Sequence, residues 1–269
     1  MSVQKFNLIG GPFQHAHSST LWKKPKHLEW DFNSKSNSTT FYVDNEIFNA
    51  LEDKDDGKRK FGWLLESRLI VPGLVERVTS SKDDLLEIYE AIFTHDKRLL
   101  ELDNKFKWCP AYGTYIEKPA LHPKTKLISM ITSNKALTPN HKLRNALAVA
   151  WADNLDLYGR GYKEIETKEE GLQDYMFSIA IENDCYETYF TEKITDCFAT
   201  GTIPVYLGAP DIGDHFNAEG IIYASEIKDL SDLTAELYES KLDAVKDNLT
   251  RSLDYDVLED WIYKNYLYS

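Results

Sequence analysis

Short apolar runs alternate along the chain with stretches of helical periodicity. Strand-like runs are predicted at 5–11, 41–44, 61–67, 91–96, 105–113, 127–135, 155–162, 174–183 and 202–208. Helical periodicity is predicted at 83–90, 97–104, 141–154, 192–200, 229–248 and 254–266. Strands that alternate with helices are typical of α/β folds with parallel sheets. The segment 22–40 shows no clean period, and we expect it to wrap the surface.

The segment 115–126 carries Pro119 and Pro123 and separates two such alternating blocks. Because domain boundaries favour such stretches, it is the best candidate for a linker. We therefore predict an α/β domain over 1–118, a second over 119–250, and a helical tail over 251–269. The two domains would face a cleft, and ligands of parallel sheets bind at the carboxyl ends of their strands.

The tail carries four apolar residues with a helix-like spacing. They are Leu258, Trp261, Ile262 and Leu267. We expect them to pack back onto the N-terminal domain, and peripheral contact with a membrane is the alternative.

Composition narrows the class of protein. With 269 residues, 42% of them hydrophobic, the chain is long enough to bury a sizeable core. A net charge of -13 argues against a nucleic-acid-binding protein. The three cysteines, Cys109, Cys185 and Cys197, form no CxxC pair, which favours free thiols in a reducing compartment. We find no secretory signal peptide and no apolar run of the ~20 residues that a membrane span needs.

The stretch TEKITDCFATG, which begins at Thr191, reads as a helix with an unusual first turn. Thr191 fits the N-cap and Gly201 the C-terminal stop. Lys193 then lies at the positive end of the helix dipole, where a cation is unfavourable by roughly 0.3–1 kcal/mol. Either Lys193 leans out into water, or it pairs with an anion that also binds the free N–H groups of the helix start.

The longer segment IENDCYETYFTEKITDCFATGTIPVYLGAP, residues 181–210, resembles the signature block of the family 10 glycosyltransferases, the α-1,3/1,4-fucosyltransferases. The family pattern has F/I-E-N, a variable gap, Y-x-T-E-K, a helix, and G-T/A-x-P-V/I-x-x-G-x-P. Weaker similarity covers KLRNALAVAWADN and LDLYGRGY upstream. The C-terminal half is well covered, and the N-terminal half thinly.

This resemblance implies a GT-B fold of two Rossmann-type α/β domains, with the nucleotide-sugar donor bound by the C-terminal one. Carried over by position, Arg144 and Lys193 would neutralise the diphosphate of GDP, and Glu192 would hold hydroxyl groups of fucose. Asn183 and Tyr189 would line the donor pocket. From the residues alone, Arg144 could equally be a surface arginine on its helix, and Asn183 a turn former.

An inverting transfer also needs a base that deprotonates the acceptor hydroxyl. In the family a strand of the N-terminal domain ends in Glu-Ser-Pro or similar. Here the run GWLLESR, residues 62–68, places Glu66 at the end of a buried strand, with Arg68 in place of the proline. Glu66 is therefore the candidate catalytic base, and a helix-capping glutamate is the alternative.

Three histidines are further candidates for contacts in the cleft. His15 and His17 lie in GGPFQHAHSST and could reach phosphate or acceptor. They could also chelate a metal, although no third ligand follows nearby. His95 lies near the end of the strand-like run AIFTHD and would either touch substrate or cap the next helix.

The expected function is thus transfer of fucose from GDP-fucose to a hydroxyl of an oligosaccharide or glycoconjugate. A different GDP- or UDP-sugar donor, or a glycan-binding protein of the same fold without turnover, are the alternatives. We expect no cofactor and no essential divalent metal. We also expect the protein to be soluble, of the bacterial or viral type, and to work in the cytoplasm of a bacterial or virus-infected cell.

Overall fold

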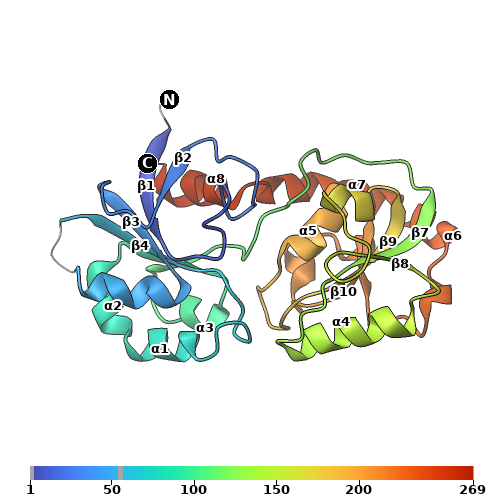
Figure 1. The fold of residues 1–269 in the computed structure, drawn as a ribbon, viewed down its shortest axis with the longest axis horizontal. Coiled ribbons are helices and arrows are strands. Elements are labelled where there is room, and N and C mark those ends of the chain that lie inside the picture. The colour runs from blue at the N-terminus through green and yellow to red at the C-terminus, as the bar shows by residue number, and fades with distance from the viewer. Residues whose placement is uncertain (1–2, 54–56, 269) are drawn as a thin grey trace. The chain divides into compact units, whose positions relative to one another are not determined.

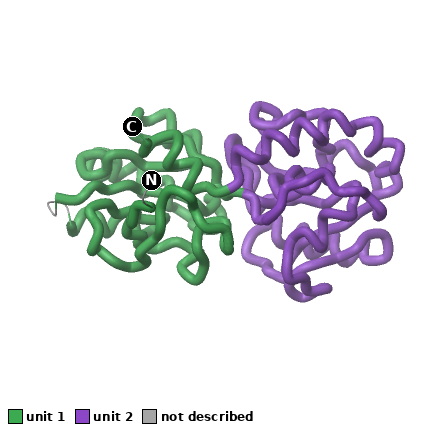
Figure 2. The backbone as a smooth tube through the Cα atoms, turned by 90° about the horizontal axis from the view of Figure 1, so that it is seen from above, with its two compact units in different colours: residues 1–113, 257–269 green, residues 114–256 purple. Residues whose placement is uncertain are grey.

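The structure is a computed structural model that describes residues 3–53 and 57–268. The chain forms two compact units (Figure 2). Unit 1 contains Met1–Gly113 and Val257–Ser269, and unit 2 contains Thr114–Asp256. The chain thus crosses between the units at 113/114 and 256/257. The boundaries predicted from the sequence are 118/119 and 250/251.

Unit 1 is built on a six-stranded parallel sheet with the order β2-β1-β3-β4-β5-β6. Figure 1 labels β1, β2, β3 and β4 of this sheet. The strands are β1 (Gln4–Ile9), β2 (Leu28–Phe32), β3 (Thr39–Val43), β4 (Arg59–Leu64), β5 (Ala91–Thr94) and β6 (Phe106–Trp108). The helices between them are a 3₁₀ helix (Asp44–Leu51), α1 (Leu74–Ser80), α2 (Lys82–Ile88) and α3 (Lys97–Leu100). The expectation of a parallel α/β sheet is confirmed.

Strand β2 corrects the prediction that 22–40 only wraps the surface. Leu28 and Trp30 are buried, and β2 pairs in parallel with β1 along its length. The alternation Leu-Glu-Trp-Asp-Phe has the period of a half-buried strand. Lysines, one proline and serines surround these five residues and obscure the alternation.

The C-terminal tail packs into the core of unit 1. Helix α8 (Leu258–Ile262) is followed by a π-helical turn (Tyr263–Leu267). Leu258 and Ile262 are buried with the aromatic residues of the sheet, and Trp261 and Leu267 pack against the same cluster. The buried Glu259 accepts hydrogen bonds from the Ser19 N–H (2.7 Å) and the Trp30 indole (3.0 Å). The apolar residues that suggested a membrane contact are therefore engaged within unit 1.

Unit 2 has a five-stranded parallel sheet in the order β11-β10-β9-β7-β8. Its strands are β7 (Lys126–Ile131), β8 (Asp156–Tyr158), β9 (Tyr175–Ile181), β10 (Ile203–Leu207) and β11 (Ile222–Tyr223). Its α-helices are α4 (Pro139–Ala150), α5 (Glu192–Ala199), α6 (Ala235–Ser240) and α7 (Leu242–Ser252). Strand β9 lies at the centre of this sheet and is almost wholly buried. The loop that follows β9 therefore begins at the middle of the sheet's carboxyl edge.

Within the described ranges, none of the helices combines the length and the apolar character that crossing a bilayer requires.

Candidate functional site

The first turn of α5 is the centre of the candidate site. Thr191 caps the helix, and its side chain accepts a hydrogen bond from the Lys193 N–H (3.4 Å). The helix ends at Ala199, and Gly201 follows with φ +71°, a conformation that glycine adopts without strain. The predicted helix and both of its end signals are confirmed.

Lys193 does not lean out into water. Its ammonium nitrogen lies 3.3 Å from Glu192 Oε1 and 3.5 Å from Glu182 Oε2, and it donates to Thr191 Oγ1 (3.0 Å). Two carboxylates and a hydroxyl thus hold the lysine at the positive end of the helix. Their attraction offsets the unfavourable interaction with the dipole.

Glu182 is the glutamate of the Ile-Glu-Asn motif, residues 181–183, and no role is predicted for it from the sequence. It follows β9, is fully buried, and accepts from Thr191 N–H (2.9 Å) and Thr191 Oγ1 (2.6 Å). A side chain at Gly208 would place its Cβ 2.6 Å from Glu182 Cγ, so a glycine is needed there. The sequence does contain a signal for this contact. The glutamate directly follows a buried strand and precedes an N-cap threonine by nine positions.

Arg144 lies on the buried face of α4. It is 6% exposed, and its guanidinium donates to the Ile181 carbonyl (2.6 Å) and to Asn183 Oδ1 (3.0 Å). Its buried Nε has no hydrogen-bond partner among the described residues. The alternative of a surface arginine is therefore wrong, and the Nε–H is a buried donor that could bind an anion.

Charges of both signs interact in this cluster. Burial alone would raise the pKa of Glu192, but Lys193 and Lys168 outweigh burial and lower that pKa to about 2. Burial lowers the pKa of Lys193, but Glu192 and Glu182 outweigh it, so the pKa is raised. Arg144 and Lys193 also act on each other as like charges. The buried Arg144 and the partly buried Lys193 together suit a ligand with more than one negative charge.

Tyr189 and Asn183 lie in the loop that joins β9 to α5. Tyr189 is buried, and its ring stacks on Tyr186 with centroids 4.9 Å apart. Asn183 accepts its hydrogen bond from Arg144. The structure thus brings Arg144, Asn183, Glu192 and Lys193 together, and Tyr189 belongs to the same loop.

Glu66 lies in unit 1, just beyond the carboxyl end of β4. Its carboxylate accepts a hydrogen bond from the Tyr112 hydroxyl (3.0 Å), and the side chain is half-buried. The Leu65 and Glu66 N–H groups donate to Asp44 Oδ1 (2.9 and 3.2 Å). The next helix, α1, begins at Leu74 with Gly73 as its N-cap, so the helix-capping alternative for Glu66 is wrong.

The three histidines have different surroundings. His95 is 2% exposed, and its Nε2–H donates to the Leu65 carbonyl (3.1 Å). Burial lowers the pKa of His95 to about 4, so the ring is neutral at pH 7. Asp96, not His95, caps α3 by accepting from Arg98 N–H (3.0 Å). His15 and His17 are exposed in the loop after β1, and their cleft contacts stay predictions.

Within residues 3–53 and 57–268, no three His, Cys, Asp or Glu side chains are grouped so that they could hold a metal ion. The expectation that no divalent metal is essential stays a prediction.

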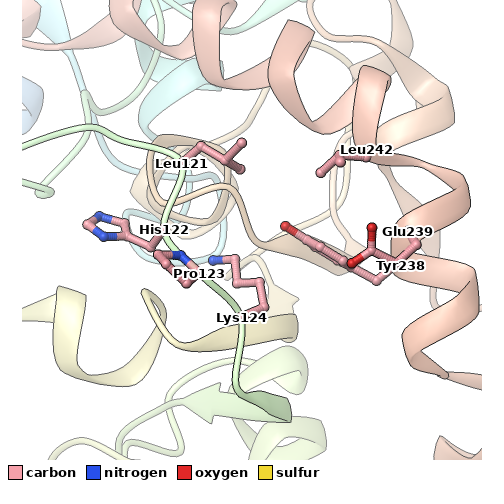
Figure 3. A pocket seen from close by; sticks show the side chains of 7 residues that line it. All are labelled: Leu121, His122, Pro123, Lys124, Tyr238, Glu239 and Leu242. Carbon is pink, nitrogen blue, oxygen red and sulfur yellow. The ribbon is translucent and has the colours of Figure 1, made fainter.

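A pocket of about 260 Å³ opens elsewhere in unit 2 (Figure 3). Its lining residues are Leu121, His122, Pro123, Lys124, Tyr238, Glu239 and Leu242. Lys124 precedes β7, and Tyr238 donates to the Gly201 carbonyl before β10 (2.8 Å), so the pocket lies at the amino edge of the sheet. The Lys124 ammonium already donates to Gln173 O, Thr200 O and Thr202 Oγ1 (2.9, 2.7 and 3.0 Å), which uses all three of its protons. The pocket is separate from the cluster around Lys193.

Two parallel α/β units, one with the cations Arg144 and Lys193 at the carboxyl edge of its sheet, define the class as a GT-B-type glycosyltransferase fold. A crystal structure of an alpha1,3-fucosyltransferase is similar over 99% of this chain and 89% of that chain, with a TM-score of 0.55 at 17% identity. A second structure, of an alpha1,3-fucosyltransferase with GDP-fucose, has a TM-score of 0.51 at 16% identity over 94% of this chain and 81% of that chain. At these identities the likeness shows the fold.

The family follows from the sequence match. The model described as "Glycosyltransferase family 10 (fucosyltransferase) C-term" matches residues 121–255, just over half of the 269 residues. The chain belongs to this family.

Individual relatives match over shorter stretches. The alpha-(1,3)-fucosyltransferase FucT of Helicobacter pylori is 30% identical over 40% of this chain and 23% of its own length. An alpha-(1,4)-fucosyltransferase of Arabidopsis thaliana is 33% identical over 24% of this chain and 16% of its own length. The matched segments thus span less than a quarter of either relative.

Proposed function

We propose that this protein is an inverting glycosyltransferase that transfers fucose from GDP-fucose to a hydroxyl of a glycan acceptor. The observation that carries the proposal is the pair of cations at the first turn of α5, the buried Arg144 and the partly buried Lys193. Helix N-termini and fixed cations both favour a diphosphate. Membership of the family and the fold support this choice of donor.

The proposed roles follow the charges that develop in the reaction. The acceptor oxygen attacks C1 of fucose, the bond from C1 to the β-phosphate oxygen breaks, and its electron pair leaves with GDP. Arg144 and Lys193 stabilise that growing negative charge, which fixed cations do best away from water. Glu192, ionised through its contact with Lys193, holds hydroxyl groups of the sugar. Glu66 takes the proton of the acceptor hydroxyl.

A panel of donors tests the proposal. The protein is incubated with GDP-fucose, GDP-mannose and UDP-sugars together with mixed oligosaccharide acceptors, and free nucleotide and product are quantified. We expect GDP-fucose to be turned over fastest and GDP to raise the melting temperature more than UDP does. Faster turnover of another nucleotide sugar would contradict the fucose donor. Absence of turnover with every donor would leave a glycan-binding protein of this fold.

The cations are tested by binding. Arg144→Ala and Lys193→Ala should each weaken GDP binding in calorimetry by about 10-fold or more, because hydrogen bonds to charged groups contribute roughly 1.5–3 kcal/mol. Lys142→Ala is the matched control, since Lys142 is exposed on the same helix as Arg144. Unchanged dissociation constants in both test variants would remove the proposed diphosphate site.

The base is tested by kinetics. Glu66→Gln should lower kcat by about 10²–10⁴-fold, which is the usual contribution of general base catalysis, and leave GDP binding unchanged. Glu101→Gln, an exposed glutamate in unit 1, is the control. A Glu66→Gln variant that retains transfer would show that another group is the base.

A further inference from the structure

Four neighbouring strands of unit 1 end next to the proposed base or its supports. Asp44 follows β3, Glu66 follows β4, His95 follows β5, and Tyr112 comes shortly after β6. These strands are adjacent in the parallel sheet, so their carboxyl ends share one edge. Tyr112 and His95 contact Glu66 Oε1 and the Leu65 carbonyl, respectively.

Asp44 holds the backbone of the same turn from its other side. One oxygen, Oδ1, accepts from both the Leu65 N–H (2.9 Å) and the Glu66 N–H (3.2 Å). The Leu65–Glu66 segment is therefore fixed by Asp44 at its N–H groups and by His95 at its Leu65 carbonyl. This leaves the direction of the Glu66 side chain little freedom, since Tyr112 also restrains its carboxylate.

The backbone of Asp44 is itself in an uncommon conformation. Its φ is +49°, in the left-handed region, and the residue is only 8% exposed. Aspartate tolerates this region better than most residues, but glycine would adopt it without strain. A buried, strained residue that is not glycine is most often kept for a purpose, and such residues cluster at functional sites.

We propose that Asp44 is a positioning residue for the catalytic base Glu66, an inference that rests on the proposed function. It acts through the two backbone amides and touches neither donor nor acceptor. Burial raises the pKa of Asp44 to about 7, and the nearby charge of Glu66 adds to the increase. The role needs only an acceptor oxygen at this position, whether the carboxyl group is charged or neutral.

Two substitutions separate positioning from general stability. Asp44→Gly removes the acceptor and suits the positive φ, so the variant should fold. Asp44→Asn keeps an acceptor oxygen at the same distance from the backbone. We expect Asp44→Gly to lower kcat by about 10- to 100-fold, because a misplaced catalytic group loses rate on that scale. We expect Asp44→Asn to keep kcat within about threefold of the wild type.

The decisive measurement is whether a substitution at Asp44 lowers kcat while KM for the donor stays unchanged. KM for the donor and the dissociation constant for GDP should stay unchanged in both variants, since Asp44 lies in unit 1 and the cations in unit 2. Asp103→Gly is the matched control: its Oδ1 accepts from the Lys105 N–H (2.9 Å) before β6, at the amino edge of the same sheet. It should keep wild-type kcat.

Wild-type kcat in Asp44→Gly would overturn the inference while leaving the proposed function intact. Equal losses in Asp44→Gly and Asp44→Asn would overturn it too, because asparagine can still accept both amides. A wild-type protein without turnover on any nucleotide sugar would instead overturn the proposed function, and this inference with it. Tryptophan fluorescence and a melting curve confirm that each variant is folded at the assay temperature.

Discussion

Glu182 shows how a single buried side chain can hold a binding site in place. It satisfies the N–H and hydroxyl of Thr191, pairs with Lys193, and donates its own N–H to the Leu207 carbonyl (2.8 Å). A carboxylate this deeply buried is stable only when its charge and its lone pairs are matched. Glu182 therefore links the end of β9 to the start of α5.

Removing Glu182 should be costly for stability and for binding. Glu182→Ala leaves Lys193 and Thr191 without their buried partner, and breaking such a pair typically costs about 3–5 kcal/mol. We expect a loss of this size in urea unfolding followed by circular dichroism, with weaker GDP binding in calorimetry. Glu164→Ala, an exposed glutamate of unit 2, should change stability by less than about 0.5 kcal/mol. A Glu182→Ala variant as stable as this control would contradict the assigned role.

His95 should make the stability of unit 1 depend on pH. Its pKa is lowered by burial from 6.5 to about 4, so the unfolded chain binds its proton more readily than the folded one. Stability from this residue is fully present above pH 6.5 and is lost as the pH falls toward 4. Between pH 7 and pH 5 the loss should be about 2 kcal/mol.

Urea unfolding followed by tryptophan fluorescence measures this effect, since five of the six tryptophans lie in unit 1. His95→Gln should make the difference between pH 7 and pH 5 about 2 kcal/mol smaller. His17→Gln, an exposed histidine in the same unit, is the control and should leave that difference as in the wild type. Equal pH dependence in His95→Gln and the wild type would count against a buried neutral ring.

At the scale of elements, the tail and β2 complete unit 1. Strand β2 adds Leu28 and Trp30 to one side of the sheet's core, and α8 adds Leu258 and Ile262. Glu259 of α8 accepts a hydrogen bond from the Trp30 indole N–H, so the two elements are joined directly. Residues from the two ends of the chain thus share one core.

Leu258→Ala tests the contribution of α8. Leu258 is fully buried, and truncation of a buried leucine costs about 2–5 kcal/mol. We expect a loss of that size in the fluorescence-detected unfolding of unit 1. Leu253→Ala is the control, because Leu253 is 51% exposed. Similar stabilities for the two variants would mean that α8 is not part of the core in solution.

At the scale of the whole molecule, the two units differ in how the chain builds them. Unit 2 is one continuous segment, Thr114–Asp256, with its own core around Phe177, Ile179 and Val205. Unit 1 needs two segments that are far apart in the sequence. The two proposed diphosphate-binding cations, Arg144 and Lys193, both lie in unit 2.

A fragment of residues 114–256 should therefore fold alone and bind GDP. Its core, the Glu182–Lys193 pair and Arg144 are all internal to the segment. We expect helical circular dichroism, cooperative unfolding, and a dissociation constant for GDP within about 10-fold of the full chain. The same fragment with Lys193→Ala serves as the control for specific binding. A fragment that folds but does not bind GDP would indicate that unit 1 contributes to the nucleotide site.

Local pattern was enough to predict most of the elements and the first turn of α5. Strand runs, the cap at Thr191 and the stop at Gly201 depend on neighbours within a few residues, so they can be read from short windows. The family resemblance located Lys193 in the contiguous block 181–210 and Arg144 in the upstream segment KLRNALAVAWADN, and each of these segments can be recognised from a short window. Glu66 could be placed at a strand end for the same reason.

Contacts between distant segments were decided only by the tertiary structure. Glu182 and Asp44 acquire their roles from groups 9 and 21 or 22 positions away, and Glu259 from a residue 240 positions away. No local pattern encodes the pairings of Asp44 and Glu259, because burial, not spacing, forces each carboxylate to find its donors. The amino-acid sequence by itself therefore determined the α/β elements, the family and the candidate cations, while the folded chain decided which buried acids contact Lys193 and the backbone of the proposed base Glu66.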